Sequence, residues 1–466
     1  MSKARQGRAS RLLRIGAITG AVAITAAACG SGTPSATSKP SATSKTTSGA
    51  GTTASSASSG GAQTVKIITW VNPPAVNALK KIDAEFQKKY PNIHVQLQTA
   101  VNVTGPYATL QQTSVAAHST DIITNVATAA PYPVKATKKT MTQWQYWTAN
   151  NVFLPLNGQP WVKDLTPAAV KNETYKGKLY GAVSGDYQYE VFYNKADFAK
   201  HHISVPKTWN QFITVLNKFK ADGVKSPIYL ATGGGAPEYT LFMYYPLMSQ
   251  IWAPQVPNGN LSVALQKGTT KWTSSYFTTV MKKEQTLAKY FEPNWAGVNW
   301  QGMPGEFANN AAPMLLDGSW DLAAVQKANP KIQVGAFPLP GTNDPSLNKG
   351  LYLGNLTFSI LRQAPDKAAA LKWLDFFETR PVYEQYVNIT GISPTQPGGT
   401  YNNFTAKALG STLGKGVDVN KIFPPLPSAG AYYDQQTHWN ALQEQVVQGQ
   451  KAPQAAQTLY QKGWKG

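Results

Sequence analysis

The sequence predicts an α/β fold that is built on a parallel sheet and divided into at least two domains. Two observations support this fold class. The segment that opens the folded part reads as strand, helix and strand, and the two kinds of element keep alternating along the chain. A strand, a crossover helix and a second strand form the unit of parallel α/β sheets. About 400 residues follow the N-terminal Ser/Thr-rich stretch, more than one hydrophobic core normally organises.

The opening unit begins with an apolar run at residues 65–70, which is typical of a strand. Asn72 is a good helix N-cap, and Pro73 and Pro74 fit the first turn of a helix. Apolar residues then recur at helical spacing up to Tyr90, where Pro91 ends the pattern. The next strand is expected over residues 93–97, because apolar and polar side chains alternate there.

Later elements follow the same alternation. Thr208 followed by Gln211 is a capping-box pattern, and it predicts a helix that ends at Gly223. Further elements are predicted from their periodicity: strands over 228–230 and 353–360, and an amphipathic helix over 366–378.

The N-terminus resembles a bacterial lipoprotein signal peptide over residues 1–28. Five basic residues precede an apolar stretch at 15–24, and small residues precede Cys29, the only cysteine of the chain. The resemblance implies that Cys29 is lipidated and that the mature protein is anchored to the outer face of a cell membrane. Ala26 departs from the leucine usual in such signals, so an ordinary cleaved signal peptide remains the alternative.

Residues 29–63 are expected to form a flexible tether. They are almost entirely Ser, Thr, Gly, Ala, Pro and Lys, a composition with too little apolar surface to pack. The formal net charge of +20 includes the five basic residues of the signal, and the remaining positive charge is almost wholly lysine, because Arg362 and Arg380 are the only arginines after the signal. Bidentate recognition of phosphates and guanine needs arginine, so we expect no nucleic acid partner.

Several segments, taken in order, resemble the extracellular sugar-binding proteins of ABC importers, the solute-binding family that includes the maltose- and multiple-sugar-binding proteins. The segments are Tyr175 to Gly181, Phe192 to Phe198, Val205 to Phe212, Phe307 to Met314 leading to Asp317 to Trp320, Val334 to Gly341, Gly391 to Pro394 and Gln448 to Pro453. The resemblance covers the chain from Thr64 to its end. Ala182, Val183 and Ser184 depart from it, because relatives usually have a proline there. Residues 131–151 also look enlarged.

The resemblance implies a two-lobe, type II periplasmic-binding-protein-like fold with a hinge and an interlobe cleft. Lobe one is expected at 64–184 plus 340–378, and lobe two at 185–339 plus 379–466. The implied function is to capture a mono- or oligosaccharide in the cleft and deliver it to the permease subunits of an ABC transporter. We expect a monomer that uses no cofactor and no metal.

A pyranose offers a flat C–H face and a rim of hydroxyls, so its site needs aromatic rings and polar side chains. The chain has 13 Trp and 22 Tyr to draw on. Trp320, after Asp317, is the leading stacking candidate, and Trp439 is expected in the core. No role is assigned to Trp252, Trp295 or Trp300. The predicted ligand-binding residues are Trp70, Asn72, Tyr187, Tyr189, Glu238, Tyr239, Asp317, Trp320, Tyr432 and Tyr433.

Two other functional classes of protein stay open. A secreted glycoside hydrolase would also use stacking aromatics, but it needs two carboxylates that face each other across the scissile bond, and no segment here resembles a hydrolase motif. A binding protein for a non-sugar solute such as ferric ion is the second alternative, because Tyr432 and Tyr433 could serve as paired tyrosine ligands. We therefore expect no enzymatic activity, and glycoside hydrolysis is the main rival to this expectation.

Overall fold

The computed structural model describes residues 62–101, 106–125, 143–354, 356–401, 403–422 and 439–464. They belong to one compact unit, Ser59–Gly466. The predicted signal peptide, Cys29 and the tether up to residue 61 lie outside the described residues. Tyr432, Tyr433 and residues 131–142 of the enlarged segment lie outside them as well.

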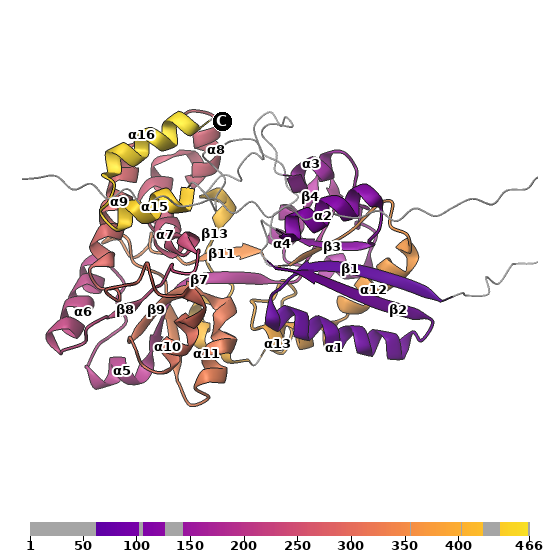
Figure 1. The fold of residues 1–466 in the computed structure, drawn as a ribbon, viewed down its shortest axis with the longest axis horizontal. Helices are drawn as coiled ribbons and strands as arrows, with labels where there is room; N and C mark the ends of the chain where they lie inside the picture. Colours follow the sequence, from indigo (N-terminus) through magenta and orange to yellow (C-terminus); the bar gives the residue numbers. More distant parts are fainter. Residues whose placement is uncertain are drawn as a thin grey trace, which may run out of the picture. The chain divides into compact units, whose positions relative to one another are not determined.

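The first sheet has five strands in the order β2-β1-β3-β12-β6. Strand β1 pairs in parallel with β2 and β3, and β12 joins antiparallel to β3, the central strand. Figure 1 shows α1 and α13 on one side of this sheet and α2 on the other. The strands are β1 (Gln63–Trp70), β2 (Ile93–Ala100), β3 (Ile122–Asn125), β12 (Thr357–Ile360) and β6 (Ala182–Val183).

The predicted strand, helix and strand opening is confirmed as β1, α1 (Pro73–Lys89) and β2. Asn72 caps α1 by accepting a hydrogen bond from the Ala75 N–H at 3.4 Å, and Lys88 and Lys89 stand at the negative end of the helix dipole. The other helices around this sheet are α2 (Pro106–Ala117), α3 (Gln143–Ala149), α4 (Pro167–Asn172), α12 (Lys367–Phe377) and α13 (Arg380–Thr390). We call this sheet with its helices lobe one.

The second sheet has the strand order β13-β11-β7-β9-β8, with β10 also paired to β7. We call this sheet with its helices lobe two. Its strands are β13 (Val417–Asp418), β11 (Leu351–Gly354), β7 (Asp186–Asn194), β9 (Met314–Gly318), β8 (Ile228–Tyr229) and β10 (Val334–Phe337). A separate hairpin consists of β4 (Thr174–Tyr175) and β5 (Lys178–Leu179).

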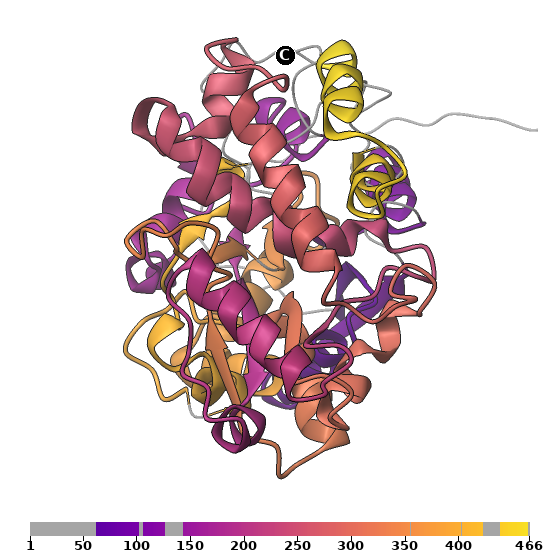
Figure 2. The same ribbon diagram turned by 90° about the vertical axis from the view of Figure 1, so that its left-hand side faces the viewer.

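Helices cover the second sheet, and Figure 2 looks onto this side of the molecule, with α15 and α16 in yellow. The predicted helix that starts after Thr208 is confirmed as α6, and the Thr208 hydroxyl accepts from the Gln211 N–H. The helices are α5 (Lys195–Lys200), α6 (Trp209–Ala221), α7 (Leu241–Leu247), α8 (Leu261–Gln266), α9 (Ser275–Ala288), α10 (Met303–Ala308), α11 (Leu322–Ala328), α14 (Phe404–Leu409), α15 (Asn440–Val447) and α16 (Pro453–Gly463).

The chain crosses between the sheets at residues 184–185, where β6 ends and β7 begins. It crosses again between β11 and β12, so the prediction of one strand over 353–360 is wrong. The first half pairs with β7 of the second sheet, and the second half, which is fully buried, pairs with β3 and β6 of the first sheet. Sequence patterning cannot reveal such a change of partner.

The lobe boundaries differ from the expected ones at two places. Residues 351–354 were expected in lobe one, yet β11 pairs with β7 and β13 of lobe two. Residues 380–390 were expected in lobe two, yet α13 buries Tyr383 and Tyr386 in the core of lobe one. Strand pairing and core contacts decide both assignments. Neither can be inferred from the order of residues along the sequence.

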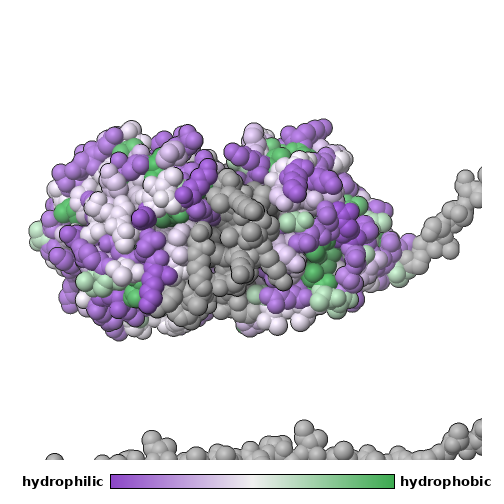
Figure 3. Space-filling view, turned by 90° about the horizontal axis from the view of Figure 1, so that it is seen from above, coloured by the Kyte–Doolittle hydropathy of each residue, from purple (hydrophilic) through white to green (hydrophobic). Residues whose placement is uncertain are grey.

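Each lobe has its own hydrophobic core. Tyr187 belongs to the core of lobe one and Tyr189, two residues later, to that of lobe two. Trp320 is partly buried and packs against both cores. Trp439 is fully buried, as predicted. Hydrophilic residues dominate the face in Figure 3, and hydrophobic residues appear there only in small patches.

Candidate ligand site at the strand ends

The candidate site lies where two neighbouring strands of lobe two end. β8 and β9 run parallel, with Ile228 opposite Met314, so the segments that follow them leave from the same edge of the sheet. Strand β7 runs antiparallel to β9, and Tyr189 stands opposite Gly318, which brings the start of β7 to this edge too. Ligands of α/β sheets bind outside the carboxyl ends of the strands.

Trp320 lies in η7 (Ser319–Asp321), the short 3-10 helix directly after β9. Its ring centroid is 4.9 Å from that of Tyr187, 5.7 Å from that of Tyr189 and 5.7 Å from that of Phe242. The two tyrosine rings meet it edge to face, at 78° and 89°. These contacts hold the indole in one orientation while it stays partly exposed.

Gly318 is required for this position of the indole. A Cβ on Gly318 would come within 2.1 Å of the Trp320 ring, far inside van der Waals contact. The backbone of Gly318 has φ −93° and ψ 154°, which any residue can adopt. The glycine therefore provides room for the indole and no special backbone conformation.

Lobe one contributes Trp70 and Asn72, at and just beyond the carboxyl end of β1. The Asn72 side-chain amide donates a hydrogen bond to the Tyr187 hydroxyl at 2.9 Å, so this edge of lobe one touches the start of β7. Trp70 is only 7% exposed and packs edge to face against Tyr107, with centroids 5.7 Å apart. Asn72 faces the junction of the sheets, whereas Trp70 belongs to the core behind it.

Glu238 and Tyr239 lie in η2 (Pro237–Thr240), in the segment that follows β8. The Tyr239 ring contacts Phe242, with centroids 5.2 Å apart, and the indole of Trp300, with centroids 4.9 Å apart and ring planes inclined by 34°. Burial raises the pKa of Glu238, and the neighbouring Glu444 carboxylate adds to the shift. Glu238 remains partly exposed, so its carboxyl is accessible to a polar ligand.

Two carboxyl groups flank Trp320 in the chain, those of Asp317 and Asp321. Asp317 is fully buried, its Oδ1 accepts from the Gly318 N–H at 2.7 Å, and none of the described residues hydrogen-bonds its Oδ2. Burial raises the pKa of Asp317 well above its ordinary value, and the adjacent Asp321 raises it further. Burial also raises the pKa of Asp321, to about 6. Burial thus favours the neutral form of both carboxyl groups.

Most of the predicted site residues come together at this edge. Trp320, Asn72 and Glu238 keep part of their surface, while Tyr187, Tyr189, Tyr239 and Asp317 are buried and support the exposed groups. Trp300, which has no role assigned from sequence patterns, joins this group through Tyr239. A bridge between residues 233 and 299 places it there, and no local pattern in the sequence signals that contact.

A small hollow of about 10 Å³ lies at the crossings between the sheets. Glu173 and Asp186 contribute carboxyl groups to it, and Tyr352 a hydroxyl. Burial raises the pKa of Asp186 to about 7, and the charge of Asp418 adds to the shift. The Asn172 side chain of α4 donates to Asp418 Oδ2 at 3.1 Å and so links the two lobes beside this hollow.

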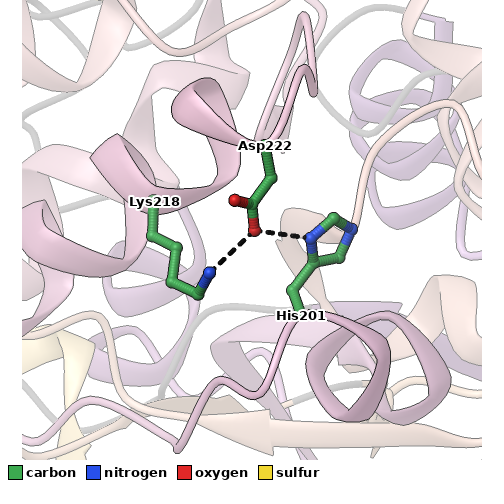
Figure 4. A network of polar contacts seen from close by, with 3 residues as sticks. All are labelled: His201, Lys218 and Asp222. Atoms are coloured by element: carbon green, nitrogen blue, oxygen red, sulfur yellow. Dashed lines mark hydrogen bonds and ion pairs between the residues drawn. The ribbon is translucent and has the colours of Figure 1, made fainter.

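Histidine and acidic side chains do not form a metal cage in the part of the chain that the structure describes, where no group of three His, Cys, Asp or Glu could hold an ion. His201 instead pairs with one carboxylate. Its Nδ1 lies 2.8 Å from Asp222 Oδ2, and Lys218 Nζ lies 2.9 Å from the same oxygen (Figure 4). Hydrogen bonds from Lys218 and His201 lower the pKa of Asp222.

None of the helices over the described ranges has the length and apolar character needed to cross a membrane. Residues 72–384 match the family described as bacterial extracellular solute-binding protein. A multiple sugar-binding protein of Streptococcus mutans serotype c is 26% identical over 324 residues, which cover 67% of this chain and 70% of the relative. An uncharacterised ABC transporter extracellular-binding protein of Pyrococcus horikoshii is 24% identical over 291 residues, covering 60% of this chain and 61% of the relative.

Solved structures share the fold. The solute-binding protein RafE of Streptococcus pneumoniae, in complex with raffinose, superposes with a TM-score of 0.68 at 18% identity, covering 86% of this chain and 99% of that one. A Bacillus licheniformis sugar transporter in complex with stachyose gives a TM-score of 0.66 at 16% identity, with 86% and 99% covered. The predicted two-lobe, type II fold is thereby confirmed. Together with the match over residues 72–384, this places the chain in the bacterial extracellular solute-binding protein family.

Proposed function

We propose that this protein captures a carbohydrate between its lobes and delivers it to the permease of an ABC transporter. The single observation that carries the proposal is Trp320. It is a partly exposed tryptophan at a strand end, it packs against both cores, and buried aromatic rings hold its orientation. An indole fixed in this way offers a flat apolar surface at the junction of the lobes, and the C–H face of a pyranose can stack on it.

The groups around the indole favour a neutral, hydroxyl-rich ligand. Asn72 offers amide atoms, Glu238 a partly exposed carboxyl, and Asp317 and Asp321 have raised pKa values. Carboxyl and amide groups both accept hydrogen bonds from hydroxyls, and an amide or a protonated carboxyl also donates them. The relatives named for sugar binding, or solved with raffinose or stachyose, support the same ligand class.

Ligand binding would act on the hinge. A sugar that touches Trp320 in lobe two and Asn72 in lobe one binds more tightly when the lobes are close, because it then contacts both at once. Only this difference in affinity can shift the population towards the closed form. The crossings at 184–185, between β11 and β12 and between α13 and α14 are where the backbone would bend. The permease would recognise the closed form.

Attachment to the membrane is proposed to occur through a lipid on Cys29. The sequence that precedes Cys29 has the three parts of an export signal, and the Ser/Thr/Gly-rich residues after it could act as a tether. A solute-binding protein held near its permease encounters it at a high effective concentration. The proposed location is the extracellular face of the cell membrane.

A panel of sugars tests the proposal. The full chain is screened by thermal shift against monosaccharides and oligosaccharides, and any bound sugar is released and identified by mass spectrometry. We expect a rise in melting temperature with particular sugars, because a ligand that binds only the native state stabilises it. We also expect the sugar to be recovered intact.

The same panel separates the rival classes. Recovery of cleaved oligosaccharide would favour a glycoside hydrolase. A coloured protein that is stabilised by ferric ion and by none of the sugars would favour iron binding instead. Either result would contradict the proposal.

A further inference from the structure

Trp300 provides a second exposed ring in the candidate site. It lies in η6 (Trp300–Gly302), between α9 and α10, and it is partly buried against the core of lobe two. Among the described residues, none accepts a hydrogen bond from its indole N–H. The indole therefore has both a free donor and part of a ring face to offer a ligand.

The backbone of the loop after β8 holds Trp300 in place. The Trp300 N–H donates to the Gly233 carbonyl oxygen at 3.2 Å, and Gly233 forms a bridge with Asn299. A Cβ on Gly233 would lie 2.4 Å from the Val298 carbonyl oxygen, so only glycine lets the two loops approach so closely. Gly233 is therefore needed for the loop that carries Trp300 to approach the segment after β8.

Aromatic rings connect Trp300 to Trp320 without a break. The Trp300 ring packs on Tyr239, Tyr239 packs on Phe242 and Phe242 packs on Trp320, with centroids 4.9, 5.2 and 5.7 Å apart. Tyr239 and Phe242 are buried, whereas the tryptophan at each end is partly exposed. The run of rings therefore has two accessible ends and a buried middle.

The two ends belong to neighbouring segments at one edge of the sheet. Trp300 lies against the loop that follows β8, and Trp320 lies directly after β9, the parallel neighbour of β8. A pyranose is about as large as one aromatic ring, so a single sugar unit can stack on only one of the two indoles. Occupying both requires a ligand that extends along the edge.

We propose that Trp300 is a specificity-determining residue that forms a second stacking surface, so that the site selects oligosaccharides over monosaccharides. The inference rests on the proposed function, since it assigns the ligand length of the same site. A longer sugar gains the contact with Trp300, and a monosaccharide bound at Trp320 does not. Glu238, next to Tyr239 in the chain, can accept hydrogen bonds from hydroxyl groups of the sugar unit at Trp300.

The test compares sugar length between variants. The full chain and its Trp300→Ala variant are titrated calorimetrically with galactose, melibiose, raffinose and stachyose, and with glucose, maltose, maltotriose and maltotetraose. Only one of the two series needs to bind the unmodified chain. For that series, we expect Trp300→Ala to lower the affinity for the trisaccharide and the tetrasaccharide about tenfold or more, while the affinity for the monosaccharide changes by no more than about twofold. Trp320→Ala should weaken every member of that series.

Two further variants serve as controls. Trp300→Phe keeps a ring against Tyr239, so it should fold normally and lose less affinity for long sugars than Trp300→Ala. Trp209→Ala removes another partly buried tryptophan of lobe two, one whose indole contacts Lys283, with Nζ 3.5 Å from the ring centroid. It should leave all sugar affinities unchanged.

The outcomes separate the two proposals. If Trp320→Ala weakens binding but Trp300→Ala weakens all lengths equally or none, the inference about Trp300 is overturned and the proposed function stands. If the unmodified chain binds no sugar of either series, the proposed function fails and the inference fails with it.

Discussion

Trp320 is the residue on which the candidate site depends, because it is the one partly exposed aromatic among the described residues that packs against both cores. Its edge-to-face contacts with Tyr187 and Tyr189 orient the indole, and Gly318 leaves room for it. The orientation is thus set by packing and is present before any ligand arrives.

Replacing the indole should weaken sugar binding. We expect Trp320→Ala to cost on the order of 1–3 kcal/mol of sugar affinity, because the stacking surface is lost. Some stability of the ligand-free protein should be lost as well, because the ring packs on both cores. Trp320→Phe keeps a ring, so it should retain part of the sugar affinity and part of the stability that Trp320→Ala loses. Calorimetric titration and urea unfolding of each variant provide the measurements, and an unchanged affinity in Trp320→Ala would place the residue outside the site.

Gly318→Ala tests the position of the indole without removing it. The added Cβ would collide with the Trp320 ring, while the backbone angles suit alanine, so the ring should move and the fold should persist. We expect weaker sugar binding and a changed tryptophan fluorescence spectrum. Gly158→Ala is the matched control, because nothing lies within 4 Å of its added Cβ. Normal affinity in Gly318→Ala would show that the indole position does not matter.

At the scale of elements, the helices of lobe one are joined by a buried carboxyl. Asp83 of α1 accepts a hydrogen bond from the Trp373 indole N–H of α12 at 2.8 Å. Burial raises the pKa of Asp83 to about 7, although the hydrogen bond from Trp373 opposes the shift. The native state therefore binds this proton more tightly than the unfolded chain does.

The stability that the protonated Asp83 carboxyl contributes is fully present below the pKa that this carboxyl has in the unfolded chain. It is lost as the pH rises from about 4 to about 7, by roughly 1.4 kcal/mol per pH unit. Asp83→Asn keeps an acceptor for Trp373 and removes the charge. We expect the variant to become more stable than the unmodified protein as the pH rises, by on the order of 2–4 kcal/mol at pH 8. Urea unfolding at pH 4.5, 6 and 8 measures the difference.

The exposed Asp222 provides a control of opposite sign. Its pKa is lowered, so its contribution is present above the unfolded pKa and is lost as the pH falls. Asp222→Asn should therefore lose a little stability at neutral pH and none in acid. A difference between Asp83→Asn and the unmodified protein that does not vary with pH would contradict the assignment to Asp83.

At the scale of the whole molecule, the lobes are connected by crossings and by side-chain contacts. The bonds from Asn72 to Tyr187 and from Asn172 to Asp418 each join lobe one to lobe two. Gly185, in the first crossing, packs so closely on Ile392 that an added Cβ would lie 2.4 Å from its side chain. Bending at these points is how a ligand at the strand ends could change the state that the permease recognises.

Membrane attachment is also a property of the whole molecule, and one residue tests it. Cys29→Ser removes the only thiol of the chain, so we expect the protein to move from the membrane fraction into the medium, still able to bind sugar. Fractionation with immunoblotting, and labelling with a fatty acid analogue, measure this. A variant that remains on the membrane would contradict lipid attachment at Cys29.

Local patterns in the sequence were enough to predict the elements that short-range physics dictates. Asn72 before two prolines starts α1, Thr208 caps α6, and the apolar run before Asn72 is β1, because capping and periodicity depend only on neighbouring residues. The segments around Trp320 also identified the family. Each of these features is determined within a few residues along the chain.

The tertiary structure alone decided which lobe a segment joins and which aromatic rings meet. The run at 353–360 divides between two sheets, α13 packs in lobe one, and Trp300 reaches the site only because Gly233 lets a distant loop approach. These outcomes depend on pairing and packing between residues far apart in the sequence. Such contacts leave no periodic signal, because one buried apolar run is compatible with several partners.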